Sequence, residues 1–331
     1  MAWRLDAGGA FGRAPAIATS GGVLLATRRG DVILFDADGR RHGTVSVGSS
    51  VEGPAVLVDG RTLIVAADGG RYGLVALDLL AGSRLWRALR GVEVDAGAAV
   101  SRGVVVAPAL DGTVYGIDFA TGEQRWRTAA VPHASHRAPP VVLPDGTVLV
   151  ASTLGRLVAL DPVDGQATWT VELGAPVEEA PAVQGGLLVV PTTRGRLVAL
   201  DPVTGADLWS IAAERTGDRF FTPTVTSEAV YAGASGGGLV SVGLDGVERW
   251  RRQTPGHVAA APLVVGGRVF AGTMDSRLVV LDAGTGAEQW SHEFPGRVKS
   301  APIAFGAMVL VPVEPGVVWA FRGARQAGSG P

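Results

Sequence analysis

Tryptophan recurs at an almost constant spacing along the chain. The recurring positions are Trp86, Trp126, Trp169, Trp209, Trp250 and Trp290. A period of about 41 residues indicates a repeat protein, in which every unit has the same local structure. This feature constrains the fold most, because a single hydrophobic core rarely organises 331 residues, whereas stacked repeats avoid that limit.

Each tryptophan ends the same short sequence pattern. An aspartate lies eight positions before it and a glycine four positions before it, as in Asp201, Gly205 and Trp209. The segment Asp-Pro-Val-Thr-Gly at 201–205 has the composition of a hairpin turn, since Asp accepts hydrogen bonds from the turn backbone, Pro fixes φ and Gly adopts a positive φ. We therefore expect the repeated aspartates to be structural and the tryptophans to pack between units. The pattern is complete at Asp78, Asp118, Asp161, Asp201 and Asp282 and shortened at Asp36 and Asp245.

The rest of each unit consists of short apolar runs between turn residues. Valine-rich runs alternate with glycine and proline, of which the chain contains 48 and 20. This predicts four short antiparallel strands per unit, named A to D in order, and no long helices. An eighth unit at 301–321 lacks strand D, and Met1–Leu5 resembles the missing strand. We therefore predict an all-β, eight-bladed β-propeller of four-stranded antiparallel blades, forming one domain over 1–323 that the N-terminal strand closes by joining the last blade, with a flexible tail at 324–331.

The repeated pattern resembles the PQQ-like propeller repeat. The shared elements are Ala-x-Asp-x-x-x-Gly-x-x-x-Trp and a preceding strand that starts with Ala-Pro or Ser-Pro, and they cover essentially the whole chain. The resemblance implies an eight-bladed propeller. That family includes quinoprotein alcohol dehydrogenases, a periplasmic lipoprotein of outer-membrane protein assembly, and sensor or scaffold domains, so it does not imply one function.

The enzymes of that family hold PQQ and Ca²⁺ through Glu, Asn and Asp, and a vicinal disulfide covers the cofactor. This chain contains no Asn and no Cys, and units of about 41 residues leave no room for the insertions that build such a site. We therefore expect neither PQQ nor another cofactor. His133 and His136 have the spacing of two metal ligands, but no third ligand matches them, so we expect no metal.

The charge balance argues against two classes of partner. A net charge of -2 provides no basic surface for nucleic acid and no polybasic segment for a membrane. No run reaches the roughly 18 apolar residues of a membrane-spanning helix, and the first residues lack the pattern of a secretory leader. We therefore expect a cytoplasmic protein, exported only if the sequence is a trimmed form of a longer chain. We also expect a monomer.

The units differ most in the loop from strand D to the next strand A. From the tryptophan position to the start of strand A, six of the eight loops have the same length, as from Trp169 to Ala180. The loop after Trp126 is longer by one position and the loop after Trp209 by two. Function in a repeat protein is expected where units differ, and such loops surround one mouth of the central channel. These two loops, with the loop that ends in Glu178 and Glu179, mark a candidate site on this face, which we name the D–A face.

The candidate site combines charged and apolar side chains. His136, Glu178 and Glu179 could act as an acid/base group, because a shared mouth of low dielectric constant would separate their pKa values. The other expected binding residues on this face are Asp95, Arg137, Leu154, Arg219, Phe220, Phe221 and Lys299. The alternative is that the charges compensate one another, while Leu154 and the two phenylalanines only cap the packing of the blades.

Two kinds of function remain open from the sequence. The first is a cytosolic binding or scaffold propeller that presents its D–A face to a protein partner or to a small apolar or amphipathic ligand. The alternative is a cofactor-independent enzyme of bacterial specialised metabolism, such as a cyclase, isomerase or lyase, with its active site at the channel mouth. An exported envelope or assembly factor is a third interpretation. A PQQ-dependent dehydrogenase is excluded by the missing cofactor ligands.

Overall fold

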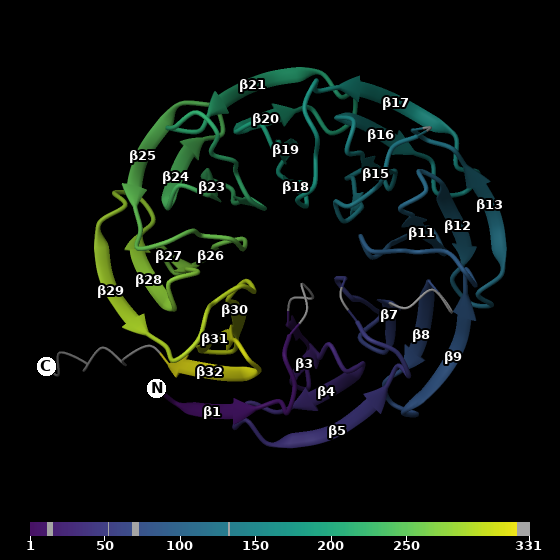
Figure 1. Cartoon of the computed structure of the whole chain (residues 1–331), viewed down its shortest axis with the longest axis horizontal. Coiled ribbons are helices and arrows are strands. Elements are labelled where there is room, and N and C mark those ends of the chain that lie inside the picture. Colours follow the sequence, from purple (N-terminus) through teal and green to yellow (C-terminus); the bar gives the residue numbers. More distant parts are fainter. Residues whose placement is uncertain (12–15, 52, 68–72, 132, 323–331) are drawn as a thin grey trace, which may run out of the picture.

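The computed structural model describes residues 1–322 apart from 12–15, 52, 68–72 and 132. Its strands form eight separate four-stranded antiparallel sheets, arranged as the blades of a ring (Figure 1). Within the described residues, no helix is long and apolar enough to cross a membrane. The predicted all-β, eight-bladed propeller is confirmed. The predicted tail at 324–331 lies outside the described residues.

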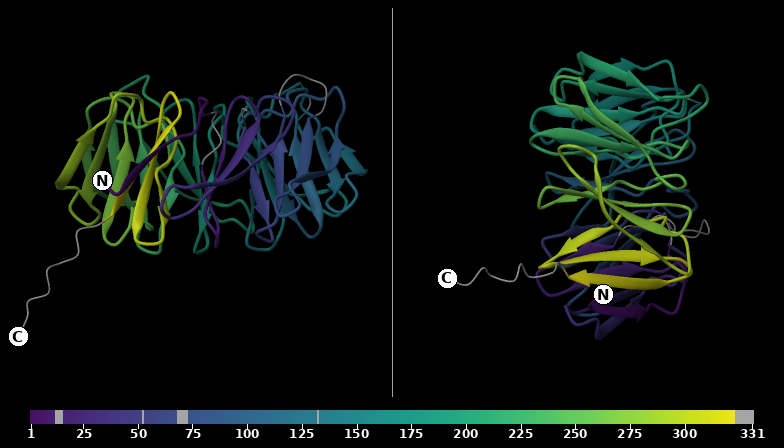
Figure 2. Two further views of the ribbon diagram at one scale, coloured as in Figure 1. Left: turned by 90° about the horizontal axis from the view of Figure 1, so that it is seen from below. Right: turned by 90° about the vertical axis from the view of Figure 1, so that its left-hand side faces the viewer.

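Every blade runs from strand A beside the central channel to strand D at the outer rim, and the ring is flat when viewed from the side (Figure 2). Blades 1 to 4 comprise β2 (Ile17–Ala18), β3 (Val23–Ala26), β4 (Asp31–Phe35) and β5 (Arg41–Ser46); β6 (Val56–Val58), β7 (Thr62–Ala66), β8 (Leu74–Asp78) and β9 (Ser83–Ala88); β10 (Ala99–Ser101), β11 (Val104–Pro108), β12 (Val114–Asp118) and β13 (Gln124–Thr128); β14 (Val141–Val142), β15 (Val148–Ala151), β16 (Arg156–Leu160) and β17 (Ala167–Glu172). Blades 5 to 8 comprise β18 (Ala182–Gln184), β19 (Leu187–Pro191), β20 (Arg196–Leu200) and β21 (Asp207–Ala212); β22 (Thr224–Val225), β23 (Ala229–Gly233), β24 (Gly238–Gly243) and β25 (Glu248–Gln253); β26 (Leu263–Val265), β27 (Arg268–Gly272), β28 (Arg277–Asp282) and β29 (Glu288–Glu293); β30 (Ile303–Phe305), β31 (Met308–Val313), β32 (Val317–Arg322) and β1 (Trp3–Asp6).

Blade 8 joins the two ends of the chain. β1 pairs antiparallel with β32, with Trp3 opposite Ala320. Trp3 also ties this blade to blade 1, because its indole N–H donates to the carbonyl of Ala37 at 2.6 Å and its ring meets Phe35 edge to face. The predicted closure by the N-terminal strand is confirmed, and β1 covers the edge that β32 would otherwise expose.

Tryptophans join neighbouring blades at six of the eight seams, in line with their predicted packing between units. The indole N–H of Trp86 donates to the carbonyl of Phe119 at 2.9 Å. Its ring lies against Gly122 of the C–D turn, where an added methyl group would be only 2.7 Å away, and Gly122 has a φ of +76°, which glycine adopts without strain. The same ring-to-glycine contact pairs Trp3 with Gly39, Trp126 with Gly165, Trp169 with Gly205, Trp209 with Gly246 and Trp250 with Gly286.

Two seams between blades lack this contact. Between blades 1 and 2, His42 takes the place of tryptophan, and a methyl group at Gly82 would meet nothing within 4 Å. Between blades 7 and 8, Trp290 is 43% exposed, because strands C and D of blade 8 belong to opposite ends of the chain and no continuous turn joins them. Trp290 stacks on His292 and meets Phe321 edge to face.

The repeated aspartates organise the C–D turns. Asp118 accepts hydrogen bonds from the backbone N–H groups of Ala120 and Thr121 and pairs with Arg125. The hydrogen bond from Thr121, together with Arg125, lowers the pKa of Asp118 to about 2. The predicted turn role is therefore supported by the geometry, and these carboxylates are engaged in the fold.

The blades are held together by apolar side chains from strands B and C. The cluster between blades 2 and 3, for example, contains Ile64, Leu74, Val105 and Ile117, none of them more than 1% exposed. Because the strands are buried against their neighbours, side chains with a chemical role must come from the loops and turns at the two faces of the ring.

Candidate functional site

One residue of the D–A loop is buried between neighbouring blades. Before blade 5, the backbone N–H of Val177 donates to the carbonyl of Ser152 at 3.1 Å, and before the last blade Val298 donates to Thr273 at 3.2 Å. Both valine side chains are fully buried. This buried residue fixes the loop, and the residues after it lead into strand A beside the channel.

His136 occupies the same buried position before blade 4. Its backbone N–H donates to the carbonyl of Ala109 at 3.4 Å, and its side chain is 0% exposed. Nδ1 lies 2.9 Å from the carbonyl oxygen of Ala151, while Nε2 has no hydrogen-bond partner in the described chain. Burial lowers the pKa of His136, and the backbone of Ala151 and Gly112 opposes this in part. His136 is thus part of the core and lies out of reach of a ligand at the channel mouth.

Phe220 and Phe221 also support the loop from within. Phe220 is 1% exposed, forms an isolated β-bridge with Ala234 and belongs to the core between blades 5 and 6. Phe221 is buried, and the guanidinium carbon of Arg219 lies 5.2 Å from the centre of its ring. The two phenylalanines, expected as binding residues, therefore offer almost no surface to a partner.

Charged side chains from two neighbouring loops meet beside these phenylalanines. Arg219 Nη1 lies 3.5 Å from Glu178 Oε2, and the two side chains are 40% and 38% exposed. Glu179 accepts a long hydrogen bond of 3.5 Å from the hydroxyl of Thr222. Glu178, Glu179 and Arg219 are named the rim cluster. The cluster is accessible from solvent, and such exposed ion pairs contribute little to stability.

A serine that the sequence analysis did not single out holds the longest loop in place. The hydroxyl of Ser235, in the B–C turn of blade 6, accepts from the backbone N–H of Arg219 at 3.0 Å and donates to Asp218 at 3.3 Å. The sequence indicated the greater length of this loop. It did not indicate that Ser235 anchors the loop, because Ser235 lies in a glycine-rich turn that has the composition of an ordinary hairpin.

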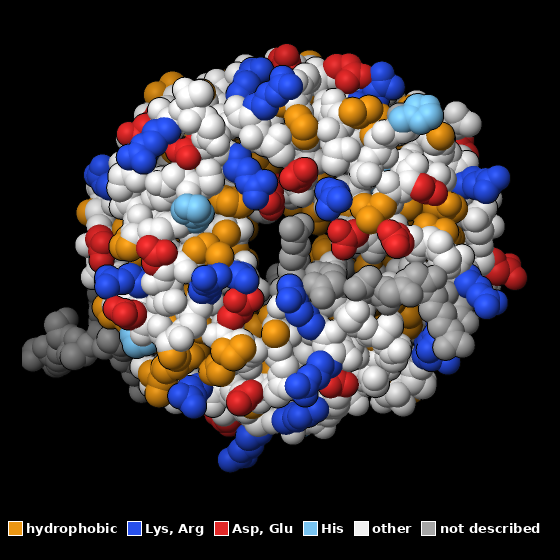
Figure 3. Space-filling model, viewed as in Figure 1, with side chains coloured by type: hydrophobic (Ala, Val, Ile, Leu, Met, Phe, Trp, Pro, Cys, Tyr) orange, Lys and Arg blue, Asp and Glu red, His pale blue; other side chains and the backbone are white. Residues whose placement is uncertain are grey.

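The remaining expected residues are spread around the ring. Asp95 and Arg137 are exposed, and Leu154 is 58% exposed in the B–C turn of blade 4. Lys299 pairs with Glu314 of blade 8 at 2.9 Å. Acidic and basic side chains both surround the central opening on the face in Figure 3. The geometry matches the alternative of mutually compensating charges better than an acid/base group.

A metal ion has no evident site in the described part of the chain. No three His, Asp or Glu side chains there are grouped in a way that could hold one. His133 and His136, which have ligand-like spacing in sequence, differ in environment, since His133 is exposed and His136 is buried.

Curated relatives resemble parts of this chain. The outer membrane protein assembly factor BamB of Yersinia pestis is 29% identical over 252 residues, which cover 68% of this chain and 62% of that protein. The protein of the same name from Burkholderia pseudomallei is 30% identical over 173 residues, 51% of this chain and 44% of that protein. The chain thus spans less than two thirds of the length of either relative.

A solved structure shows the same fold. The crystal structure of BamB from Moraxella catarrhalis superposes with a TM-score of 0.80 and covers 97% of this chain and 98% of that chain, at 20% sequence identity. At this identity the likeness establishes the architecture of the ring and nothing about the surface.

The relatives correct the expected function. Neither a cytosolic binding scaffold nor a biosynthetic cyclase, isomerase or lyase agrees with proteins named as outer membrane protein assembly factors, so both expectations are wrong. The expected cytoplasmic location is wrong for the same reason, and the expected lack of any membrane context finds no support in these names. The physical cause of the error is that composition and repeat residues determine the stability of the ring and do not determine its cellular location.

A family model covers the whole ring. The model described as outer membrane protein assembly factor BamB matches residues 1–136 and 110–326, two overlapping segments that together include strands of all eight blades. The chain therefore belongs to this family of eight-bladed, PQQ-like propellers.

Proposed function

We propose that this propeller is a protein-binding component in the assembly of outer membrane proteins and that it contacts its partner through the D–A face. The observation that carries the proposal is the family match, which extends over the whole ring. A ring whose strands are buried against one another is suited to presenting loops on a rigid support, which is how propellers and other repeat proteins bind.

The contact surface is proposed to lie over blades 4 to 6. There the longest D–A loop is fixed by Ser235, so that Arg219 is held beside Glu178 without losing its exposure. Leu154 offers the exposed apolar side chain of this region. A preordered charged pair next to an apolar residue supports recognition, because the charges orient the partner and the apolar group gains from desolvation.

The test uses the cell that encodes this chain. Loss of the protein is expected to lower the amount of folded integral protein in the outer membrane, and a wild-type copy is expected to restore it. Copies that carry Arg219→Glu or Leu154→Asp should accumulate normally but restore less. Arg219→Glu places a like charge beside Glu178 and should slow association with the partner, an effect that added salt reduces.

Val203→Asp is the matched control, since Val203 is 56% exposed on the C–D turn of blade 5, at the opposite face. This variant should restore outer membrane protein as well as the wild type does. An outer membrane unchanged by loss of the protein would contradict the function. Full restoration by both D–A variants would contradict only the position of the surface.

A further inference from the structure

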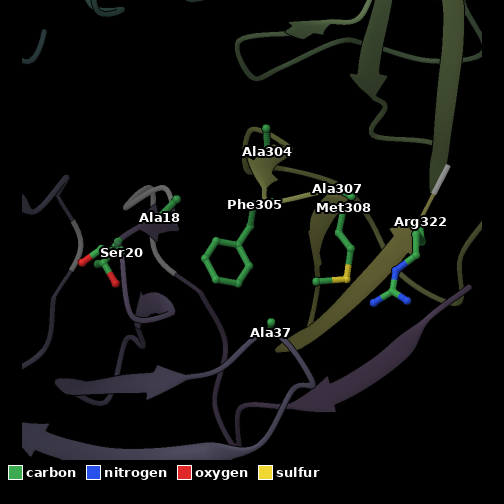
Figure 4. A pocket seen from close by; sticks show the side chains of 10 residues that line it. Ala18, Ser20, Ala37, Ala304, Phe305, Ala307, Met308 and Arg322 are labelled. Atoms are coloured by element: carbon green, nitrogen blue, oxygen red, sulfur yellow. The ribbon is translucent and has the colours of Figure 1, made fainter.

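A cavity of about 1060 Å³ opens at the seam between blades 8 and 1, on the face opposite the D–A face (Figure 4). Its walls are the A–B turns of the two blades, at 18–20 and 304–308, together with Ala37 of a C–D turn and Arg322 at the end of β32. Four alanines, Phe305 and Met308 make most of the lining apolar. The volume is typical of sites for small ligands.

The register of the strands shows which residues of blade 8 replace the charged pair of blade 2 at this face. In blade 2, Asp78 ends strand C opposite Thr62 and pairs with Arg61 of the A–B turn. In blade 8, Arg322 ends strand C opposite Met308, so it occupies the position of Asp78, and Ala307 occupies that of Arg61.

Blade 8 therefore has a cation where blade 2 has an anion, and a methyl group where blade 2 has the balancing cation. Its strands C and D also come from opposite ends of the chain, so no continuous C–D turn fills the space beside β32. The first difference leaves the seam with a positive charge, and the second leaves space beside β32.

Arg322 lacks a partner among the residues that the structure describes. It is exposed and makes no hydrogen bond or ion pair with them, whereas Arg61 is bound to Asp78. Figure 4 shows the guanidinium group beside the side chain of Met308, with Phe305 next to it along the same wall. Ser20 contributes a hydroxyl group from the A–B turn of blade 1.

We propose that this cavity binds a small amphipathic anion, consisting of an alkyl chain or ring that carries one carboxylate or phosphate group. The fork of N–H donors on Arg322 matches the oxygens of either group. Phe305, Met308 and the alanines remove the apolar part of the ligand from water. Ser20 lies at the other end of the cavity from Arg322 and so faces the part of the ligand that is remote from its anionic group (Figure 4).

The test measures binding of decanoate, decyl phosphate and decanol to the full chain by isothermal titration calorimetry, the two anions below their micelle concentrations and decanol below its solubility limit. One molecule of decanoate or decyl phosphate should bind per chain, and decanol should bind about tenfold more weakly, because it has no charge for Arg322. Binding of one anion only would identify the headgroup and still support the site. Absence of binding by both anions, or equal affinity for decanoate and decanol, would overturn the proposal.

Two substitutions distinguish binding to the charge of Arg322 from a general attraction of the anions to arginines on the surface. Arg322→Gln should weaken binding of the anions about tenfold and leave decanol unchanged. Arg215→Gln, at an exposed arginine on the D–A face, should change neither. Equal losses in the two variants would show that the anions respond to overall charge and would refute the site.

Two further variants test whether the apolar wall takes part in binding and whether the chain's own C-terminus occupies the cavity. Ala304→Trp fills the cavity from an exposed position of β30 and should abolish binding of all three probes while leaving the melting temperature unchanged. Unaltered decanoate affinity in this variant would contradict the proposal. A chain that ends at Arg322 with a C-terminal amide, which adds no carboxylate beside the guanidinium, should bind as the full chain does. If only the shortened chain bound decanoate, residues 323–331 would be the occupant and the proposal would be wrong.

Discussion

A tryptophan and a glycine form the smallest contact that joins neighbouring blades. The contact requires two properties of the glycine, a positive φ and the absence of a side chain under the indole ring. Gly122 and Gly82 have equivalent places in the C–D turns of adjacent blades and similar φ values, +76° and +62°. They differ in that Gly122 lies against Trp86, whereas Gly82 follows a unit in which His42 replaces tryptophan.

This pair allows backbone strain to be separated from packing. Gly82→Ala should lower the free energy of unfolding by about 1 kcal/mol, because alanine resists the positive φ. Gly122→Ala should cost a further 1–3 kcal/mol or so, because its methyl group also displaces the Trp86 ring. Guanidinium unfolding curves of the two variants measure the difference. Equal losses would mean that the tryptophan contact does not contribute to cohesion of the ring.

The buried imidazole of His136 should make stability depend on pH. Its pKa is lowered in the folded chain, so as pH falls below about 6.5 the unfolded chain takes up a proton that the folded chain does not. Stability contributed by neutral His136 is therefore fully present above that pH and is lost as pH falls toward the lowered pKa. The melting temperature should decrease between pH 7.5 and pH 5.5.

His136→Val should make this decrease smaller, since valine fills the equivalent position at Val177 and Val298 and cannot take up a proton. His257→Gln, at an exposed histidine of another D–A loop, serves as the control and should leave the decrease as it is in the wild type. A pH profile that is the same in the His136 variant and the wild type would exclude His136 as its source.

At the scale of elements, the D–A loops show what the sequence can predict and where prediction stops. The period of the tryptophans, the turn aspartates and the strand-like N-terminus were sufficient for eight blades and their closure, because each feature has a local physical cause. The greater length of the loops after Trp126 and Trp209 also pointed to the places where the chain departs from the repeat.

The burial of individual loop residues could not be predicted, because the extra residues shift the register. In the loops of common length before blades 5 and 8, the buried residue lies three positions before Ala180 or Ala301, as Val177 and Val298 show. In the longer loops it lies only two positions before the equivalent residue, Ala138 or Thr222, which brings His136 and Phe220 into the core. When the loops are aligned on the Ala-Pro pair that follows them, the buried His136 and Phe220 therefore fall at the same position as the accessible Glu178.

The hydrogen bonds to Ser235 should keep the loop at 213–219 in its closed conformation. Ser235→Ala removes the acceptor for the backbone N–H of Arg219 and the donor to Asp218, so the loop should open more often. Hydrogen exchange over 213–219 should become faster while exchange in β23 and β24 stays unchanged. Ser227→Ala, at an exposed A–B turn of the same blade, is the control and should not affect this loop. Unaltered exchange in the Ser235 variant would contradict the assigned anchor.

At the scale of the whole molecule, closure of the ring depends on one short strand. β1 supplies the fourth strand of blade 8 and, through Trp3, the hydrogen bond and ring contact that reach blade 1. In every other blade all four strands are consecutive in sequence. Loss of β1 would therefore affect two seams at once, since β32 would expose its backbone edge and Phe35 would lose its covering ring.

Deletion of residues 1–6 should lower the free energy of unfolding by about 3 kcal/mol or more, the usual cost of removing one packed tryptophan, to which the lost strand pairing adds. Deletion of 324–331 removes no residue of the described ring and should change stability far less. Trp290→Ala provides a second comparison, because Trp290 is largely uncovered at the seam of blades 7 and 8 and should cost less than Trp3→Ala. Melting temperatures measure these effects, and light scattering should show self-association of the 1–6 deletion through the free edge of β32. Equal melting temperatures for the two truncated chains would contradict the role of β1, because only β1 links the ends of the chain into one ring.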